Sequence, residues 1–200
     1  AVLGVERWGM KLACEGTSWL PQKELMKDYG ESTLIATQVS PNGFLQTKAF
    51  SLFGQRVHQD AVVSAALLSF GIKLEDVRLS AQPVIVGKHK GVKVRVNLKA
   101  GNAADALVIV SNETVWVTIV SLPTEDRLRQ QRVDEIVRRL EFTTPTKAIV
   151  LEDLGAKDGD QHATFFMAIS LHCMKLKQAE QAREFVHMAV KLRPDSQELA

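Results

Sequence analysis

The sequence predicts an α+β protein, in which an antiparallel sheet is covered by helices and followed by a C-terminal helical hairpin. Residues 92–98 alternate between apolar and polar side chains, which is the two-residue period of a half-buried strand. Residues 106–110 and 114–120 are two more strand-like runs, separated by three polar residues that can close a tight hairpin. A helical spacing of apolar residues follows at 133–140. We therefore expect a three-stranded meander under a helix, with Trp116 in the core between them.

The N-terminal part of the chain carries a weaker pattern, followed by a clear hairpin. Residues 8–12 alternate and predict a short first strand, and Pro21 suits the first turn of a helix. Residues 32–39 and 44–52 are β-like runs joined by a Ser-Pro-Asn-Gly sequence typical of a turn. We expect these last two runs to pair as antiparallel strands.

A change of period marks the first long helix. Between residues 55 and 70, apolar and Ala residues recur every three or four positions, and Gly71 stands where a helix commonly ends. Residues 82–86 return to a strand pattern and lead through a Gly- and Lys-rich turn into the meander. The helix should therefore pack on the sheet that the flanking strands form.

The segment after the meander predicts a closing helix and a domain boundary. Pro123 and the acidic residues behind it are typical of a helix start, and the arginines at 138–139 occupy a last turn, where cations are favoured. The Thr-Thr-Pro-Thr sequence from Thr143 breaks this pattern. We expect a sheet domain at residues 1–143 and a helical segment at residues 147–200.

The order of these elements resembles the PsbP-like fold, the α/β/α family of the photosystem II extrinsic proteins and their non-photosynthetic relatives. The resemblance lies mainly in residues 84–142, where a strand about a Gly turn, a closing hairpin and a helix ending in Leu-Glu-Phe follow one another. The N-terminal third departs from the family, whose opening strand and Pro–Trp pair are matched only by residues 7–9 and 19–21. The resemblance implies a non-enzymatic binding or assembly module and leaves the ligand open.

The C-terminal segment resembles a single tetratricopeptide (TPR) repeat. Small residues at three positions allow two antiparallel helices to approach, and larger apolar residues fill the space between them. The residues with this spacing are Phe166, Ile169, Ser170, Cys173, Ala182, Val186, Ala189 and Pro194. The first, third and fourth of these depart from the usual Trp, Gly and aromatic residue of the repeat. An unrelated helical hairpin would pack similarly.

One repeat cannot bury its own apolar faces, so the hairpin needs a cover. We expect Phe165, Met167 and Met188 to be exposed beyond the helix pair and to bind another protein or peptide, or a second copy of the chain. The cover could instead be the sheet domain, an element formed by residues 147–154, or further repeats in a natural chain that continues past Ala200.

The overall composition excludes several classes of protein. The 200 residues are 46% hydrophobic and 24% charged, with a formal net charge of +2, as in ordinary soluble globular proteins. This balance does not favour general binding to nucleic acid, and no apolar run is long enough to span a membrane. Cys14 and Cys173 lie far apart and outside any zinc-binding spacing, so we expect two free thiols.

Neither a catalytic site nor a metal site is indicated by the sequence. His172 and Cys173 diverge by about 100° on a helix, so they cannot easily bind one ion together with His187. No GxSxG, P-loop, GxGxxG or HExxH motif occurs. We therefore expect no enzyme and no cofactor.

A basic stripe is the remaining candidate site. It comprises Lys88, Lys90, Lys93, Arg95 and Lys99, with no acidic residue between its members, and it is either a solvated face or a source of positive field. The sequence thus favours a protein-interaction or assembly module that acts as a scaffold. It does not fix the compartment, and we consider export to a bacterial cell envelope or a thylakoid-like compartment and, alternatively, the cytoplasm. The alternative function is binding of an anionic ligand or nucleic acid through residues 88–99.

Overall fold

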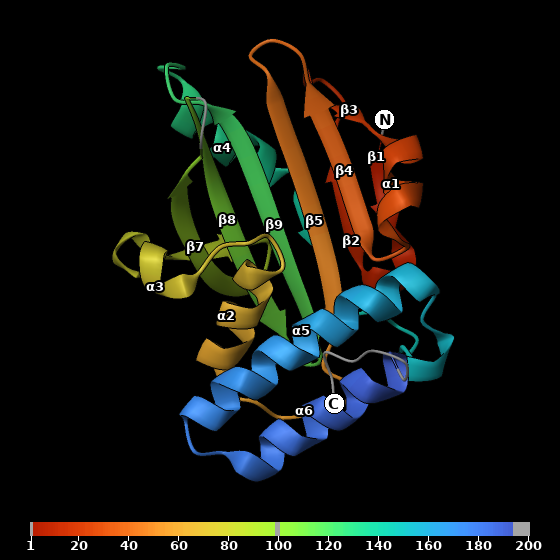
Figure 1. Cartoon of the computed structure of the whole chain (residues 1–200). Coiled ribbons are helices and arrows are strands. Elements are labelled where there is room, and N and C mark those ends of the chain that lie inside the picture. Colours follow the sequence, from red (N-terminus) through yellow and green to blue (C-terminus); the bar gives the residue numbers. More distant parts are fainter. Residues whose placement is uncertain (1, 99–100, 194–200) are drawn as a thin grey trace.

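A seven-stranded antiparallel sheet forms the centre of the molecule (Figure 1). The computed structural model describes residues 2–98 and 101–193. The strands follow one another across the sheet as β3 (Leu20–Pro21), β4 (Thr33–Gln38), β5 (Gly43–Ser51), β9 (Thr114–Pro123), β8 (Asn102–Ser111), β7 (His89–Asn97) and β6 (Gln82–Val86). Every neighbouring pair is antiparallel. The predicted α+β class is thus confirmed.

The meander and the earlier hairpin lie where the sequence predicts them. Strands β7, β8 and β9 follow one another along the chain, and Asn112, with a φ of +51°, lies in the turn between the last two. Strands β4 and β5 pair from Thr33 opposite Lys48 to Gln38 opposite Gly43. Strand β5 also pairs with β9, and this pairing joins the β4–β5 hairpin and the meander into one sheet.

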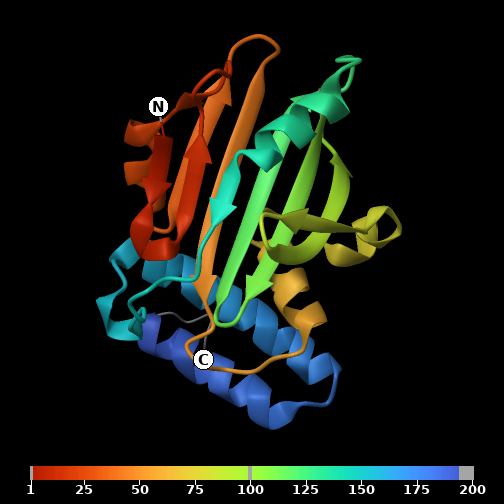
Figure 2. The same ribbon diagram turned by 180° about the vertical axis from the view of Figure 1, so that it is seen from behind.

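A small sheet and one helix cover one face of the central sheet (Figure 2). The small sheet has the order β1 (Val2–Val5), β2 (Met10–Ala13) and β10 (Leu140–Phe142), and the helix is α4 (Arg129–Arg138). Apolar side chains of all four elements share a core with one face of the central sheet. The sequence predicts β2 but not its pairing with β10, in which Leu12 lies opposite Leu140.

Helices cover the opposite face of the central sheet (Figure 1). Helix α2 (Gln59–Leu68) and helix α5 (Ala156–Lys175) lie against the sheet, and α6 (Ala179–Leu192) packs on α5. The shorter elements are α1 (Lys23–Tyr29), α3 (Leu74–Val77), and the 3-10 turns η1 (Glu6–Trp8), η2 (Arg78–Ser80) and η3 (Leu151–Asp153). In the described part of the chain, no helix is long and apolar enough to cross a bilayer.

The start of the closing helix differs from the prediction. Pro123 ends β9 opposite Asn102, and α4 begins only at Arg129. Proline has no backbone N–H, and it is tolerated at the end of a strand because the sheet needs no hydrogen bond from an N–H there. In the turn that follows, Asp126 Oδ1 accepts a hydrogen bond from the Leu128 N–H at 3.0 Å. The acidic residues behind Pro123 therefore belong to this turn.

A continuous core connects the two predicted segments of the chain. Phe165 and Phe166 of α5 are buried together with Phe50 of β5 and with α2. The connection from β10 to α5 is irregular, and residues 147–154, expected as a helix or strand, contain only the short turn η3. The sheet itself therefore provides the cover that the helical hairpin requires.

Trp116 lies in the core beneath the small sheet and α4. Its side chain is fully buried, and its ring stacks on Phe142 with centroids 5.0 Å apart and an interplanar angle of 14°. Its Nε1 donates a hydrogen bond to the Trp8 carbonyl oxygen at 2.8 Å. Val133 and Ile136 of α4 belong to the same core. The predicted position of Trp116 between sheet and helix is confirmed.

Replacement of Trp116 by alanine should lower the free energy of unfolding by about 3–5 kcal/mol, because it leaves a cavity among rigid neighbours. Chemical denaturation of the intact chain measures this loss. Leu79→Ala is a suitable control, since Leu79 is fully exposed and its removal should leave stability unchanged. A Trp116→Ala variant that unfolds at the wild-type midpoint would show that the ring does not support the core.

Candidate functional site

Two buried polar residues, one turn apart on α5, hold the C-terminal hairpin on the sheet. The first is Asp158, which is 2% exposed. Its carboxylate accepts hydrogen bonds from the N–H groups of Glu31 and Ser32 at 3.1 and 3.2 Å, and from Ser32 Oγ at 2.8 Å. A side chain at Gly30 would collide with this carboxylate, and the φ of +97° there is readily adopted by glycine. Asp158 thus attaches α5 to the start of β4.

His162 makes the second connection between α5 and the sheet. Its Nε2 accepts a hydrogen bond from the Ser51 N–H at 3.1 Å, and its Nδ1 lies 2.8 Å from the Asp158 carbonyl oxygen. A neutral ring with its proton on Nδ1 satisfies both contacts. Four aromatic rings surround it at centroid distances of 5.4, 5.2, 5.9 and 5.8 Å, and they belong to Trp8, Phe50, Phe53 and Phe166.

The surroundings of His162 oppose its protonation. Burial lowers the pKa of His162 from 6.5 to about 4, although the hydrogen bond to the Asp158 carbonyl acts in the opposite direction. A second ring proton on Nε2 would also face the N–H of Ser51, which is itself a donor. The imidazole is therefore neutral in the folded protein near pH 7, and it serves as a structural acceptor.

The apolar residues expected to bind a partner lie mostly inside the molecule. Phe165 is 1% exposed and stacks on Phe50 with centroids 4.2 Å apart, and Met188 is 9% exposed. The expectation that these two side chains are exposed is wrong, because Phe165 lies on the side of α5 that faces the sheet and α2, and Met188 of α6 packs into the same core. Met167 is half-buried at the margin of the same core. Pro194, expected to end the second helix, lies outside the described residues.

The strongly exposed apolar residues of α5 lie on its outer face. Leu171 and Met174 are 60% and 58% exposed. They follow Met167 at spacings of four and three residues, which places all three along one side of the helix. We call this set, Met167, Leu171 and Met174, the α5 stripe. Sequence reasoning identified only its first member, because helical spacing alone does not show which side of a helix meets the sheet.

The basic residues predicted as an anion site do not share one face. Lys93 and Arg95 lie on the face of β7 that carries α4, whereas Lys90 occupies the alternate position and lies on the opposite face. Lys88 is exposed in the turn before β7, and Lys99 lies outside the described residues. The expected single stripe is therefore divided by the two-residue period of the strand.

Carboxylates from neighbouring elements lie beside the two cations near α4. Arg95 Nε and Arg129 Nη2 each lie 3.3 Å from Oδ1 of the buried Asp105, and Lys93 Nζ lies 3.9 Å from Asp134 Oδ1. A hollow of about 480 Å³ lies here, and we call it the basic hollow; it is lined by Ser80, Gln82, Lys93, Val94, Arg95, Asp105 and Gln130. The cations Lys93, Arg95 and Arg129 pair here with only two carboxylates, those of Asp105 and Asp134. One positive charge of this group is therefore uncompensated.

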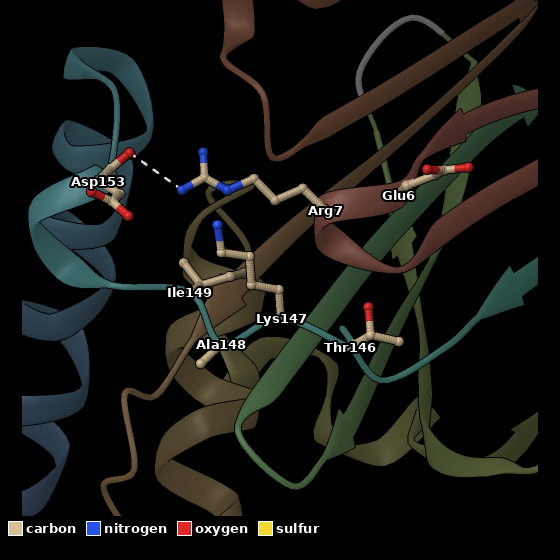
Figure 3. A pocket seen from close by; sticks show the side chains of 7 residues that line it. All are labelled: Glu6, Arg7, Thr146, Lys147, Ala148, Ile149 and Asp153. Carbon is tan, nitrogen blue, oxygen red and sulfur yellow. Dashed lines mark hydrogen bonds between the residues drawn. The ribbon is translucent and has the colours of Figure 1, made fainter.

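Another hollow, of about 570 Å³, lies between η1 and the segment before α5 (Figure 3). Arg7 and Lys147 extend toward the same region, whereas Glu6 points away from it. Arg7 Nη2 donates to the Asp153 carbonyl oxygen at 3.3 Å, and Arg7 Nη1 pairs with Glu31 at 3.0 Å. Because Arg7 is already engaged, this hollow offers mainly the Lys147 ammonium to a ligand.

Neither thiol has the surroundings of a reactive cysteine. Cys14 and Cys173 are free and buried, and burial raises the pKa of each thiol. A thiol with a raised pKa is a poor nucleophile. Within residues 2–98 and 101–193, no three or more His, Cys, Asp and Glu side chains are grouped to hold a metal ion.

Comparisons with known proteins find similarity only among solved structures. No family model and no curated protein matches the chain. A crystal structure from Bacteroides thetaiotaomicron is similar at 12% identity over 94% of this chain and 69% of that chain, with a TM-score of 0.45. The solution structure of cyanobacterial PsbP (CyanoP) from Synechocystis sp. PCC 6803 is similar at 9% identity over 72% of this chain and 92% of that chain, with a TM-score of 0.47. The comparisons give no evidence for a TPR repeat.

The stability of the protein should fall as the pH falls from about 6.5 toward 4, because the unfolded chain protonates His162 where the folded chain does not. Because the pKa of His162 is lower in the folded than in the unfolded chain, its full stabilisation of the fold, about 3 kcal/mol, is present above the unfolded-state pKa. This stabilisation is lost as the pH falls through the folded-state pKa. Denaturant titrations across this range measure it. His162→Gln should lose this part of the pH dependence, whereas His187→Gln, at an exposed position, should retain it. Equal pH profiles for wild type and His162→Gln would contradict the assignment.

Proposed function

We propose that the chain is a non-enzymatic interaction module that binds another protein through the α5 stripe. The exposure of Leu171 and Met174, at 60% and 58%, is the observation that carries this proposal. A partner that covers these side chains removes their apolar surface from water, and full burial of one such side chain contributes about 1.5–3 kcal/mol. An amphipathic helix has the shape and the apolar spacing to do so.

The fixed position of α5 supports this role. Asp158 and His162 attach the helix to β4 and β5, and Phe165 stacks on the sheet from the same side. A helix held in this way has little conformational freedom to lose on binding, so its exposed side chains contribute more of their burial energy to affinity. The resemblance of the sheet domain to PsbP-like proteins in its sequence pattern fits a scaffold or assembly factor.

The proposal is tested with a photo-crosslinking amino acid at Thr164, an exposed position two turns before Leu171 on α5. Crosslinked products formed in the native host should fall about tenfold or more when Leu171 and Met174 are both replaced by Asp, given the apolar area lost. Leu79→Asp changes a still more exposed apolar residue, on η2, and should leave the products unchanged. A product containing two copies of the chain would identify self-association as the mode of binding. Products of equal yield in the stripe variant and the control would refute the proposal.

A second candidate function is binding of an anionic ligand at the basic hollow. The uncompensated positive charge among Lys93, Arg95 and Arg129 favours it. Asp105 and Asp134 already pair with these cations, so an anion must compete with two carboxylates for them. We therefore rank this function below protein binding.

Replacement of Lys93 and Arg95 together by Gln should weaken retention on heparin or polyphosphate and reduce its dependence on salt, because fewer counterions are released. The salt slope of binding measures the change, and circular dichroism checks the fold. Lys88→Gln with Lys90→Gln is the matched control, since these residues lie away from the hollow. If the slope is the same in both double variants, Lys93 and Arg95 belong to a solvated surface.

A further inference from the structure

A small hollow lies between the loop after β2, the end of β4 and α4. Its volume is about 140 Å³, and it is lined by Gly16, Thr17, Ser18, Trp19, Gln38, Arg132, Glu135 and Ile136. Water occupies about 30 Å³ per molecule in the liquid, so the hollow has room for about four or five non-hydrogen atoms. It is distinct in position from the α5 stripe and the basic hollow.

Gln38 provides a buried donor in this hollow. The residue is 3% exposed, and its Oε1 accepts a hydrogen bond from Ser18 Oγ at 2.9 Å. Its Nε2 is buried, and no hydrogen-bond partner for it lies among the described residues. A buried N–H without an acceptor is unfavourable, so an occupant that accepts from Nε2 is favoured.

The side chain of Gln38 is held in place by its neighbours. Gln38 lies opposite Gly43 in the β4–β5 hairpin. A Cβ at Gly43 would come within 3.0 Å of Gln38 Cγ and the ring of Trp19, so glycine allows these two side chains to lie close to the strand. Together with the bond from Ser18, this packing fixes the amide before any ligand arrives, which lowers the entropy cost of binding.

Arg132 provides a second set of donors. Its Nε lies 2.9 Å from Asp126 Oδ2, but neither atom makes a hydrogen bond of good geometry within the described residues. The ion pair with Asp126 therefore engages the guanidinium through Nε and positions it, while its two terminal nitrogens make no hydrogen bond among the described residues. A guanidinium donates two parallel hydrogen bonds to a planar carboxylate.

We propose that this hollow binds a carboxylate that carries a short apolar group. Gln38 and Arg132 donate to the carboxylate oxygens, and Trp19 and Ile136, which are 4% and 1% exposed, contact the apolar group. Glu135 also lines the hollow, so it disfavours a doubly charged phosphate more than a singly charged carboxylate. The carboxylate belongs either to a free short-chain acid or to the C-terminus of a peptide.

The test is an NMR titration of the intact ¹⁵N-labelled chain with propionate, followed at the Gln38 side-chain amide and the Trp19 indole N–H. Saturable shifts of both signals are expected, and none with propionamide, which has the same shape without the charge. A tripeptide with a free C-terminus is then compared with its amide. Tighter binding of the free tripeptide than of propionate identifies a C-terminus as the ligand, and the reverse order identifies a free acid.

Matched variants separate this site from non-specific binding. Gln38→Glu preserves the shape and the acceptor for Ser18 but removes the donor, and Arg132→Gln removes the guanidinium; each should weaken propionate binding about tenfold or more. Arg138→Gln changes an exposed arginine outside the hollow and should not. Arg132→Gln decides the question if Gln38→Glu fails to fold. Equal affinity for propionate and propionamide, equal affinities of the Arg132 and Arg138 variants, or no saturable shift would overturn the proposal of a carboxylate site.

Discussion

Strands β8 and β9 are apolar on both faces, and the fold follows from the need to remove both faces from water. Ala106 and Val108 contribute to the core under α2 and α5, whereas Leu107 and Ile109 contribute to the core under α4 and the small sheet. Strand β9 divides in the same way. A sheet buried on one face only would leave half of these side chains exposed. The helical hairpin and the small sheet are therefore both parts of one folded unit.

The two covers are attached by different kinds of interaction. The small sheet is attached through apolar packing around Trp116 and through backbone pairing of β2 with β10. The hairpin combines apolar packing with the directional hydrogen bonds of Asp158 and His162. Each such bond adds little net stability. A shift of α5 along the sheet would, however, break these bonds and leave buried polar groups without partners. They therefore define where α5 lies, and with it which side of the helix faces outward.

Local periodicity was sufficient to predict the elements whose partners are close in sequence. The meander, the β4–β5 hairpin and α2 could be located because their periods are visible within a few residues. The strand β10 could not, because three residues after a helix carry no pattern of their own and pair with β2 from the other end of the chain. The same limit applies to the sites. Asp158 and His162 are recognisable as polar residues on the apolar side of α5, but nothing near Gln38 in sequence indicates that Arg132 lies beside the same hollow.

The pairing of β2 with β10 has a consequence for synthesis on the ribosome. The N-terminal strands leave the exit tunnel first, yet β2 obtains its second neighbour only after Leu140 has emerged. Until then the apolar side chains of Trp8, Met10 and Leu12 lack much of the core that surrounds them in the folded chain. Contacts of such high sequence separation slow folding and expose the nascent chain to association. A chaperone that binds short apolar segments would therefore be expected to act on residues 8–12 of the nascent chain.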